Sequence, residues 1–88
     1  GMILSNEPGY YKKNNFGIRI ENLVYVDKKN GKLFFKNLTM APIEKDLINL
    51  NLLTIAEKNY LFKYHLDVYS KISKYLNPNE KKWLASHI

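Results

Sequence analysis

The chain has 88 residues, of which 45% are hydrophobic and 14% aromatic, and it carries a formal net charge of +6. This length suits one small globular region, and the composition excludes an intrinsically disordered chain. The absence of cysteine excludes disulfides and thiolate metal sites. No apolar run approaches the roughly 20 residues that cross a membrane, and no signal peptide is recognised. We therefore expect a cytoplasmic location.

The positive charge is carried almost entirely by lysine, because Arg19 is the only arginine. Arginine is the usual residue for bidentate recognition of phosphates and base edges. The lysines are scattered along the chain, which favours a solvated lysine-rich surface. A basic nucleic-acid-binding module stays as the remote alternative.

The N-terminal half predicts a small antiparallel sheet. Residues 2–5 predict a short strand that ends before the turn-forming pair Pro8-Gly9. Residues 16–27 alternate and are rich in β-branched side chains, so they predict a longer strand. The Asn30-Gly31 pair predicts a hairpin turn, because both central positions of a type I′ turn need positive φ. Residues 32–37 then return as the next strand.

The pattern becomes helical after Pro42. Residues 43–50 predict a short helical turn with Leu47 and Ile48 facing inward. The segment Thr54-Ile55-Ala56-Glu57 matches a capping box, in which the first and last side chains satisfy each other's backbone N–H groups. Apolar residues then recur at helical spacing, which predicts a helix that ends near Leu76.

A second helix is predicted to begin at Asn77-Pro78-Asn79-Glu80, which supplies a cap, a proline at the first position and a glutamate at the third. The expected fold class is therefore α+β, with a small antiparallel sheet followed by a helical hairpin. At most three strands are visible in the sequence, so the sheet needs another layer on its apolar face. The helical hairpin or a partner chain could supply that layer.

Two glutamates are candidates for chemistry. Glu7 precedes a Pro-Gly turn, and Glu21 lies within the longer predicted strand on the same face as Arg19. Flanked by Ile20 and Leu23, the Glu21 carboxylate is expected to be partly buried and to need a cation. That cation is either Arg19 or a metal, and from composition alone the Arg19–Glu21 ion pair is the commoner arrangement.

The residue strings around these glutamates resemble a known family. Residues 6–11, Asn-Glu-Pro-Gly-Tyr-Tyr, and residues 16–22, Phe-Gly-Ile-Arg-Ile-Glu-Asn, closely resemble aminopeptidase P (Xaa-Pro aminopeptidase), a pita-bread metallopeptidase. Residues 38–43, Leu-Thr-Met-Ala-Pro-Ile, are similar to a further segment of its long form. The resemblance implies that residues 2–41 are C-terminal strands of the pita-bread catalytic domain. It also implies that residues 42–88 form the C-terminal helical region of the long form.

The resemblance further implies a centre of two divalent metal ions, usually manganese, built from two aspartates, one histidine and two glutamates. Glu7 and Glu21 match the two glutamates, and the second of these normally bridges both ions. Arg19 would orient the carboxylates or face the substrate. The metal pair would activate water to attack the bond before proline in a peptide substrate.

The other three ligands have no counterpart in this chain. His65 and His87 lie in the helical region, where a packing or surface role is expected. We therefore expect no tightly bound metal and no catalytic activity from the chain alone, as for the C-terminal part of a larger or split enzyme with an N-terminal partner chain. In the long form the C-terminal region contributes to subunit association. The alternative is thus a non-catalytic dimerisation module, and a homo-oligomer is expected.

Overall fold

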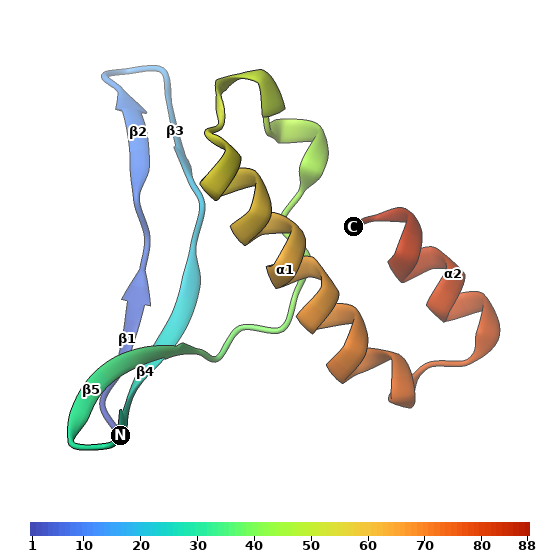
Figure 1. Cartoon of the computed structure of the whole chain (residues 1–88). Coiled ribbons are helices and arrows are strands. Elements are labelled where there is room, and N and C mark those ends of the chain that lie inside the picture. The colour runs from blue at the N-terminus through green and yellow to red at the C-terminus, as the bar shows by residue number, and fades with distance from the viewer. The chain divides into compact units, whose positions relative to one another are not determined.

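The computed structural model describes residues 1–88, which form two compact units, residues 1–39 and residues 40–88. The first unit holds all of the strands and the second holds all of the helices (Figure 1). This order confirms the α+β class, with a small antiparallel sheet preceding two main helices.

The first unit has five strands, all paired antiparallel. A three-stranded sheet has the order β1-β4-β5, and β2 and β3 form a separate two-stranded ribbon. The strands are β1 (Ile3–Asn6), β2 (Gly9–Lys12), β3 (Phe16–Arg19), β4 (Asn22–Lys29) and β5 (Lys32–Asn37).

Two tight turns reverse the chain in this unit. Asn30 (φ 52°) and Gly31 (φ 77°) form the predicted turn between β4 and β5. The positive φ at both positions is the requirement of a type I′ turn, so this prediction is confirmed. Asn14 (φ 58°) turns the chain between β2 and β3, where the Asn15 N–H donates to the Lys12 carbonyl at 3.0 Å. Asparagine adopts this left-handed conformation more readily than other side chains.

The strand boundaries differ from the sequence prediction in two places. The single strand expected over residues 16–27 is two strands, because Ile20 and Glu21 leave the ladder between β3 and β4. The Pro8-Gly9 pair does not reverse the chain, and Gly9 instead begins β2, which was not predicted. Proline donates no hydrogen bond to a ladder, so its presence interrupts pairing without turning the chain.

No residue of the first unit is buried. The sheet is a single layer, and apolar side chains such as Ile3, Leu33 and Phe35 remain 60% or more exposed. Neighbouring positions on a strand point to opposite faces, so Phe34 and Phe35 place aromatic rings on both sides of the sheet. The first unit therefore has no hydrophobic core of its own.

The second unit contains two α-helices and three short 3₁₀ turns. The helices are α1 (Ile55–Ile72) and α2 (Pro78–Ser86), and α2 doubles back after a tight connection (Figure 1). The 3₁₀ turns are η1 (Lys45–Leu47), η2 (Leu50–Leu52) and η3 (Ser73–Tyr75).

Both predicted helix starts are confirmed as capping boxes. The Glu57 N–H donates to the Thr54 hydroxyl at 3.1 Å, and the Thr54 N–H donates to the Glu57 carboxylate at 2.8 Å. Asn77 and Glu80 exchange the equivalent two hydrogen bonds, each at 2.9 Å. These contacts satisfy backbone N–H groups that have no partner inside the helix.

The core of the second unit is small and lies between α1 and α2. Its buried side chains are Tyr64, His65 and Val68 from α1 and Leu84 from α2. The expectation that Leu47 faces inward was wrong, because its side chain is 71% exposed. It lies in a 3₁₀ turn of only three residues, which is too short to form the apolar stripe of an α-helix.

Candidate metal-ligand carboxylates

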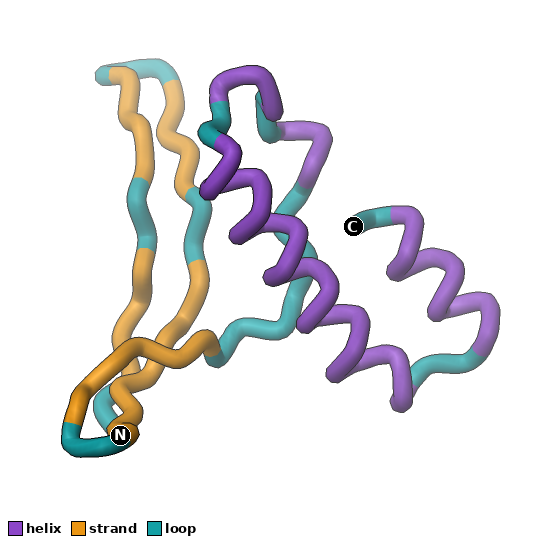
Figure 2. The backbone as a smooth tube through the Cα atoms, viewed as in Figure 1, coloured by secondary structure: helices purple, strands orange, loops and turns teal.

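Glu7 and Glu21 lie opposite each other across an interruption between two strand pairs. On one side of the interruption Asn6 pairs with Asn22, and on the other side Gly9 pairs with Arg19. Each strand contributes two residues to the gap, so the register continues without a shift and sets Glu7 against Glu21. The Ile20 N–H donates to the Pro8 carbonyl at 3.2 Å, which holds the neighbouring pair in the same register. Figure 2 shows the two unpaired segments side by side, as loops within two long strands.

This arrangement places two negative charges at one cross-strand position. Directly opposed side chains in an antiparallel pair have Cβ atoms about 5 Å apart, and like charges there are destabilising. The Glu7 side chain forms no ion pair or hydrogen bond. The Glu21 carboxylate forms the only ion pair of the chain, accepting from Arg19 Nε at 3.4 Å. The pair of carboxylates is therefore only partly compensated by protein charge.

The expectation that Glu21 is partly buried was wrong. Its side chain is 43% exposed, because the first unit has no layer over this face. An exposed carboxylate keeps its hydration and needs no cation to remain charged. Both glutamates are thus available as oxygen donors, the ligand type that hard divalent cations prefer.

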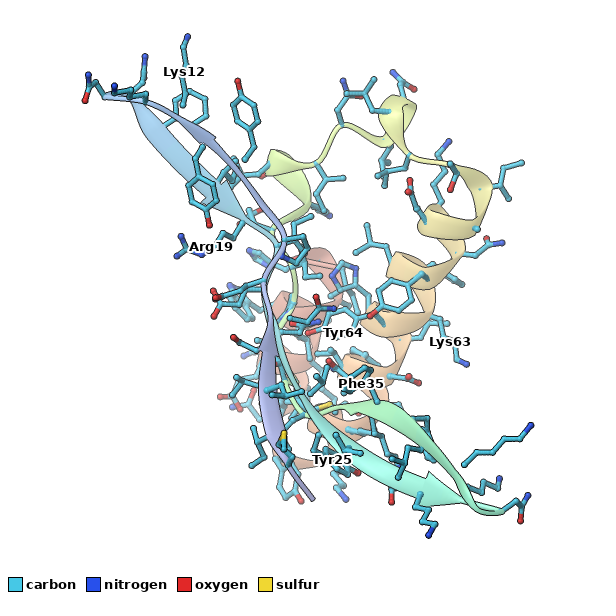
Figure 3. All side chains as sticks on the ribbon, turned by 90° about the vertical axis from the view of Figure 1, so that its left-hand side faces the viewer. Lys12, Arg19, Tyr25, Phe35, Lys63 and Tyr64 are labelled. Atoms are coloured by element: carbon cyan, nitrogen blue, oxygen red, sulfur yellow. The ribbon has the colours of Figure 1, made fainter.

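Arg19 lies beside these carboxylates and is held by two acceptors. Its guanidinium donates to the Tyr11 hydroxyl oxygen and to the Glu21 carboxylate, and these two contacts, that of Tyr11 first, raise the pKa of Arg19. Figure 3 shows Arg19 projecting outward from the strand ribbon. Arg19, Glu21 and Tyr11 therefore form one hydrogen-bonded row along the face that carries Glu21.

Two glycines make room for Tyr11 in that row. A Cβ atom on Gly17 would lie 2.7 Å from Tyr11 Cδ1, and one on Gly9 would lie 3.0 Å from the Tyr11 hydroxyl and 2.8 Å from Arg19 Cγ. The Tyr11 ring thus lies flat across bare backbone. Sequence reasoning missed Tyr11 and Gly17, whose roles depend on the β2–β3 register that pairs them. Their positions could have given a signal. Gly17 lies two residues before Arg19 on the same strand face, and Tyr11 pairs with Gly17 across the ribbon.

The other titratable candidates do not join this site. His65 is buried in the core of the second unit, and His87 ends α2 with its Nδ1 atom 2.8 Å from the Trp83 carbonyl. No group of three or more histidine, aspartate or glutamate side chains converges to hold a metal ion. No helix is both long and apolar enough to cross a bilayer. Glu7 and Glu21 therefore stand as a pair, without a third carboxylate or histidine beside them.

Comparison with known proteins assigns the chain to a class. Residues 1–28 match the metallopeptidase family M24, and residues 31–88 match the C-terminal region of peptidase M24. The two matches meet at the turn between β4 and β5, whereas the compact units divide after residue 39. Together they cover nearly the whole chain, which therefore belongs to the M24 metallopeptidase family.

Individual relatives narrow this class. The chain is 43% identical to Xaa-Pro aminopeptidase 1 of Dictyostelium discoideum, over all of this chain and 16% of the relative. It is 42% identical to a peptidase of Schizosaccharomyces pombe, over 99% of this chain and 16% of the relative. An X-prolyl aminopeptidase from Caenorhabditis elegans, a cytosolic enzyme with a di-nuclear active site, matches 97% of this chain with a TM-score of 0.80 and 36% identity. The chain spans about a sixth of the length of these relatives.

Proposed function

We propose that this chain supplies Glu7 and Glu21 to the dinuclear metal centre of an Xaa-Pro aminopeptidase. The observation that carries the proposal is the register that opposes these two carboxylates, within motifs of a metallopeptidase family. Support for a two-metal site comes from the C. elegans relative, which has a di-nuclear active site. The oxygen donors suit divalent cations, and Mn²⁺ is the metal we propose.

Each protein group has a separate task in this proposal. Glu7 and Glu21 would be the oxygen ligands that this chain offers to the metal ions. Arg19 holds the Glu21 carboxylate in one orientation, since its Nε–H donates to Oε2. Tyr11 is the second partner of the guanidinium in this proposal. When bound, the metals supply Lewis-acid activation of a water for attack on the bond before proline in a peptide substrate.

The site cannot be completed within these 88 residues. Two carboxylates bind a divalent cation weakly and leave its geometry undefined. We propose that the remaining ligands lie outside this sequence, in a longer chain or in an N-terminal partner chain, and that the isolated chain is inactive. Residues 2–41 would then be strands of the catalytic domain, and residues 42–88 its helical C-terminal region. We propose a cytoplasmic location, by analogy with the C. elegans relative.

A chimaera tests this function. The C-terminal segment of the D. discoideum relative that aligns with this chain is replaced by it, and hydrolysis of an Xaa-Pro peptide is measured with Mn²⁺. We expect activity in the chimaera and a loss of more than about 100-fold for Glu7→Gln or Glu21→Gln, since even residues that only support metal ligands cost 10–100-fold. Glu44→Gln is the matched control, because an amide still accepts the Asp46 N–H that Glu44 caps. Full activity of the Glu7→Gln chimaera would contradict the proposal.

A dimerisation module is the second candidate. It is favoured by the exposure of large apolar residues that have no covering layer, such as Phe35 at 67%. Such residues are typical of surfaces that are covered by another chain. Light scattering after size-exclusion chromatography tests this function. A monomer at high concentration would remove it, whereas the metal-site proposal would be unaffected.

A further inference from the structure

The segment Ala41–Lys45, which we call the strap, connects the boundary of the two units to the first 3₁₀ turn. It is tied to α1 by two hydrogen bonds, which involve neighbouring residues of that helix. The Tyr64 hydroxyl donates to the Ala41 carbonyl at 2.5 Å, and the Ile43 N–H donates to His65 Nε2 at 3.1 Å. The second bond needs a free lone pair on Nε2, so the imidazole is neutral and carries its proton on Nδ1.

A third tie joins the strap to α2, where Lys45 Nζ donates to the Ser86 carbonyl at 2.8 Å. Lysine and tyrosine ordinarily titrate near pH 10, whereas histidine titrates near pH 6.5. Of the three ties, only that of His65 therefore depends on protonation between pH 5 and pH 8. The His65 imidazole is buried, with 6% of its surface exposed, as is Tyr64.

The surroundings of His65 disfavour its protonation. Burial lowers the pKa of His65 and outweighs the backbone hydrogen bond with Ile43, which acts in the opposite direction; the positive charge of Lys45 adds to the lowering. No carboxylate forms an ion pair with the ring, because the chain's single ion pair is elsewhere. On the strap, Glu44 is engaged in capping η1. The other titratable groups within about one turn of His65 on α1 are Lys63, Tyr64, Asp67 and Tyr69. Those of α2 are Glu80, Lys81, Lys82 and His87.

We propose that His65 is an acid-sensitive latch, in which protonation of Nε2 displaces the Ile43 N–H and releases the strap from α1. A protonated ring presents an N–H to the Ile43 N–H, so a hydrogen bond becomes a clash of two donors. The strap residues Ala41 and Pro42 also line an open, apolar pocket of about 560 Å³ together with Val68 and Leu84. Release of the strap would therefore reshape this pocket.

The direction of the pH dependence follows from linkage. His65 binds a proton less tightly when it is buried and accepts from Ile43 than when the strap is released. The latch is therefore closed at pH values above the ordinary pKa of histidine, about 6.5. It is weakened as the pH falls below about 6.5 and continues to weaken until the pH passes below the pKa of latched His65. Within that interval the ratio of latched to released strap falls by up to about tenfold per pH unit.

Amide hydrogen exchange in the full 88-residue chain tests the latch. The protection factor of the Ile43 amide, corrected for intrinsic exchange, is measured from pH 8 to pH 5 together with the ring nitrogen signals of His65. We expect the Nδ1–H tautomer at pH 8, and a loss of Ile43 protection of at least tenfold that follows protonation of His65. Amides in the middle of α1 should keep their protection across the same range.

Two variants separate the latch from a general acid effect. His65→Gln retains a hydrogen-bond acceptor but does not titrate, so Ile43 protection should become independent of pH. His87→Gln removes the other histidine and should leave the wild-type pH dependence unchanged. An Nε2–H tautomer at pH 8, or constant Ile43 protection in the wild type, would overturn the proposal. Either result can be read from the wild-type chain even if a variant does not fold.

Discussion

Replacing Gly17 by alanine should disturb the hydrogen-bonded row beside Glu21 without touching Glu21 itself. The new Cβ would lie 2.7 Å from Tyr11 Cδ1 and 3.0 Å from Cε1, whereas ordinary contact begins at 3.4 Å. The ring must therefore move by about 0.7 Å, or turn away from the strand. A displaced ring takes its hydroxyl away from Arg19, and the guanidinium keeps only Glu21 as a partner.

The Arg19 Nε–H group reports this change directly, because Arg19 is the only arginine and gives one unambiguous NMR signal. We expect exchange of this N–H with water to accelerate about two- to fivefold in Gly17→Ala, a range suited to solvent-exposed charge pairs. Tyr11→Phe should reproduce the effect, since it removes the same hydroxyl. Tyr10→Phe is the matched control, because Tyr10 points to the opposite face. Unchanged Arg19 exchange in both Gly17→Ala and Tyr11→Phe would refute this account of the row.

The remaining predictions concern stability, measured by urea unfolding of the chain. Val68→Ala should lower the free energy of unfolding by about 2 kcal/mol, because it removes two carbons from the most buried side chain, which is only 1% exposed. A loss below about 0.5 kcal/mol would show that this core is not packed as described. Thr54→Ala should cost about 1 kcal/mol by removing the α1 cap, whereas Thr54→Ser should cost much less. Stability should fall between pH 7 and pH 5 by no more than about 1.4 kcal/mol per pH unit through His65, and this component should vanish in His65→Gln.

Local signals in the sequence predicted the turn and the helix starts. The Asn30-Gly31 turn and the two capping boxes each depend on a few adjacent residues. Their conformation can therefore be predicted without knowing the rest of the fold. The break at Ile20 and Glu21 was not predictable in this way. The alternation of apolar residues continues through it, and only the pairing of both strands reveals that two residues on each side leave the ladder.

The site was partly predictable for a related reason. The motifs identified Glu7 and Glu21, but their opposition depends on a register that no single segment encodes. The exposure of Glu21 was mispredicted from its apolar neighbours, because those neighbours belong to a unit that has no buried residue of its own. Tyr11 became visible only when its ring was found lying over Gly17, a contact between two strands.

Paramagnetic broadening by Mn²⁺ can show whether Glu7 and Glu21 form one cation-binding pair, as we propose. The ¹⁵N-labelled chain is titrated with Mn²⁺, and the amide signals are followed residue by residue. The account predicts weak binding, in the millimolar range, with broadening that is strongest on both sides of the interruption, at residues 6–9 and 19–22 together. Glu7→Gln should abolish the effect at both segments, whereas Glu44→Gln should not. Broadening at only one segment, or broadening that persists in Glu7→Gln, would contradict the claim.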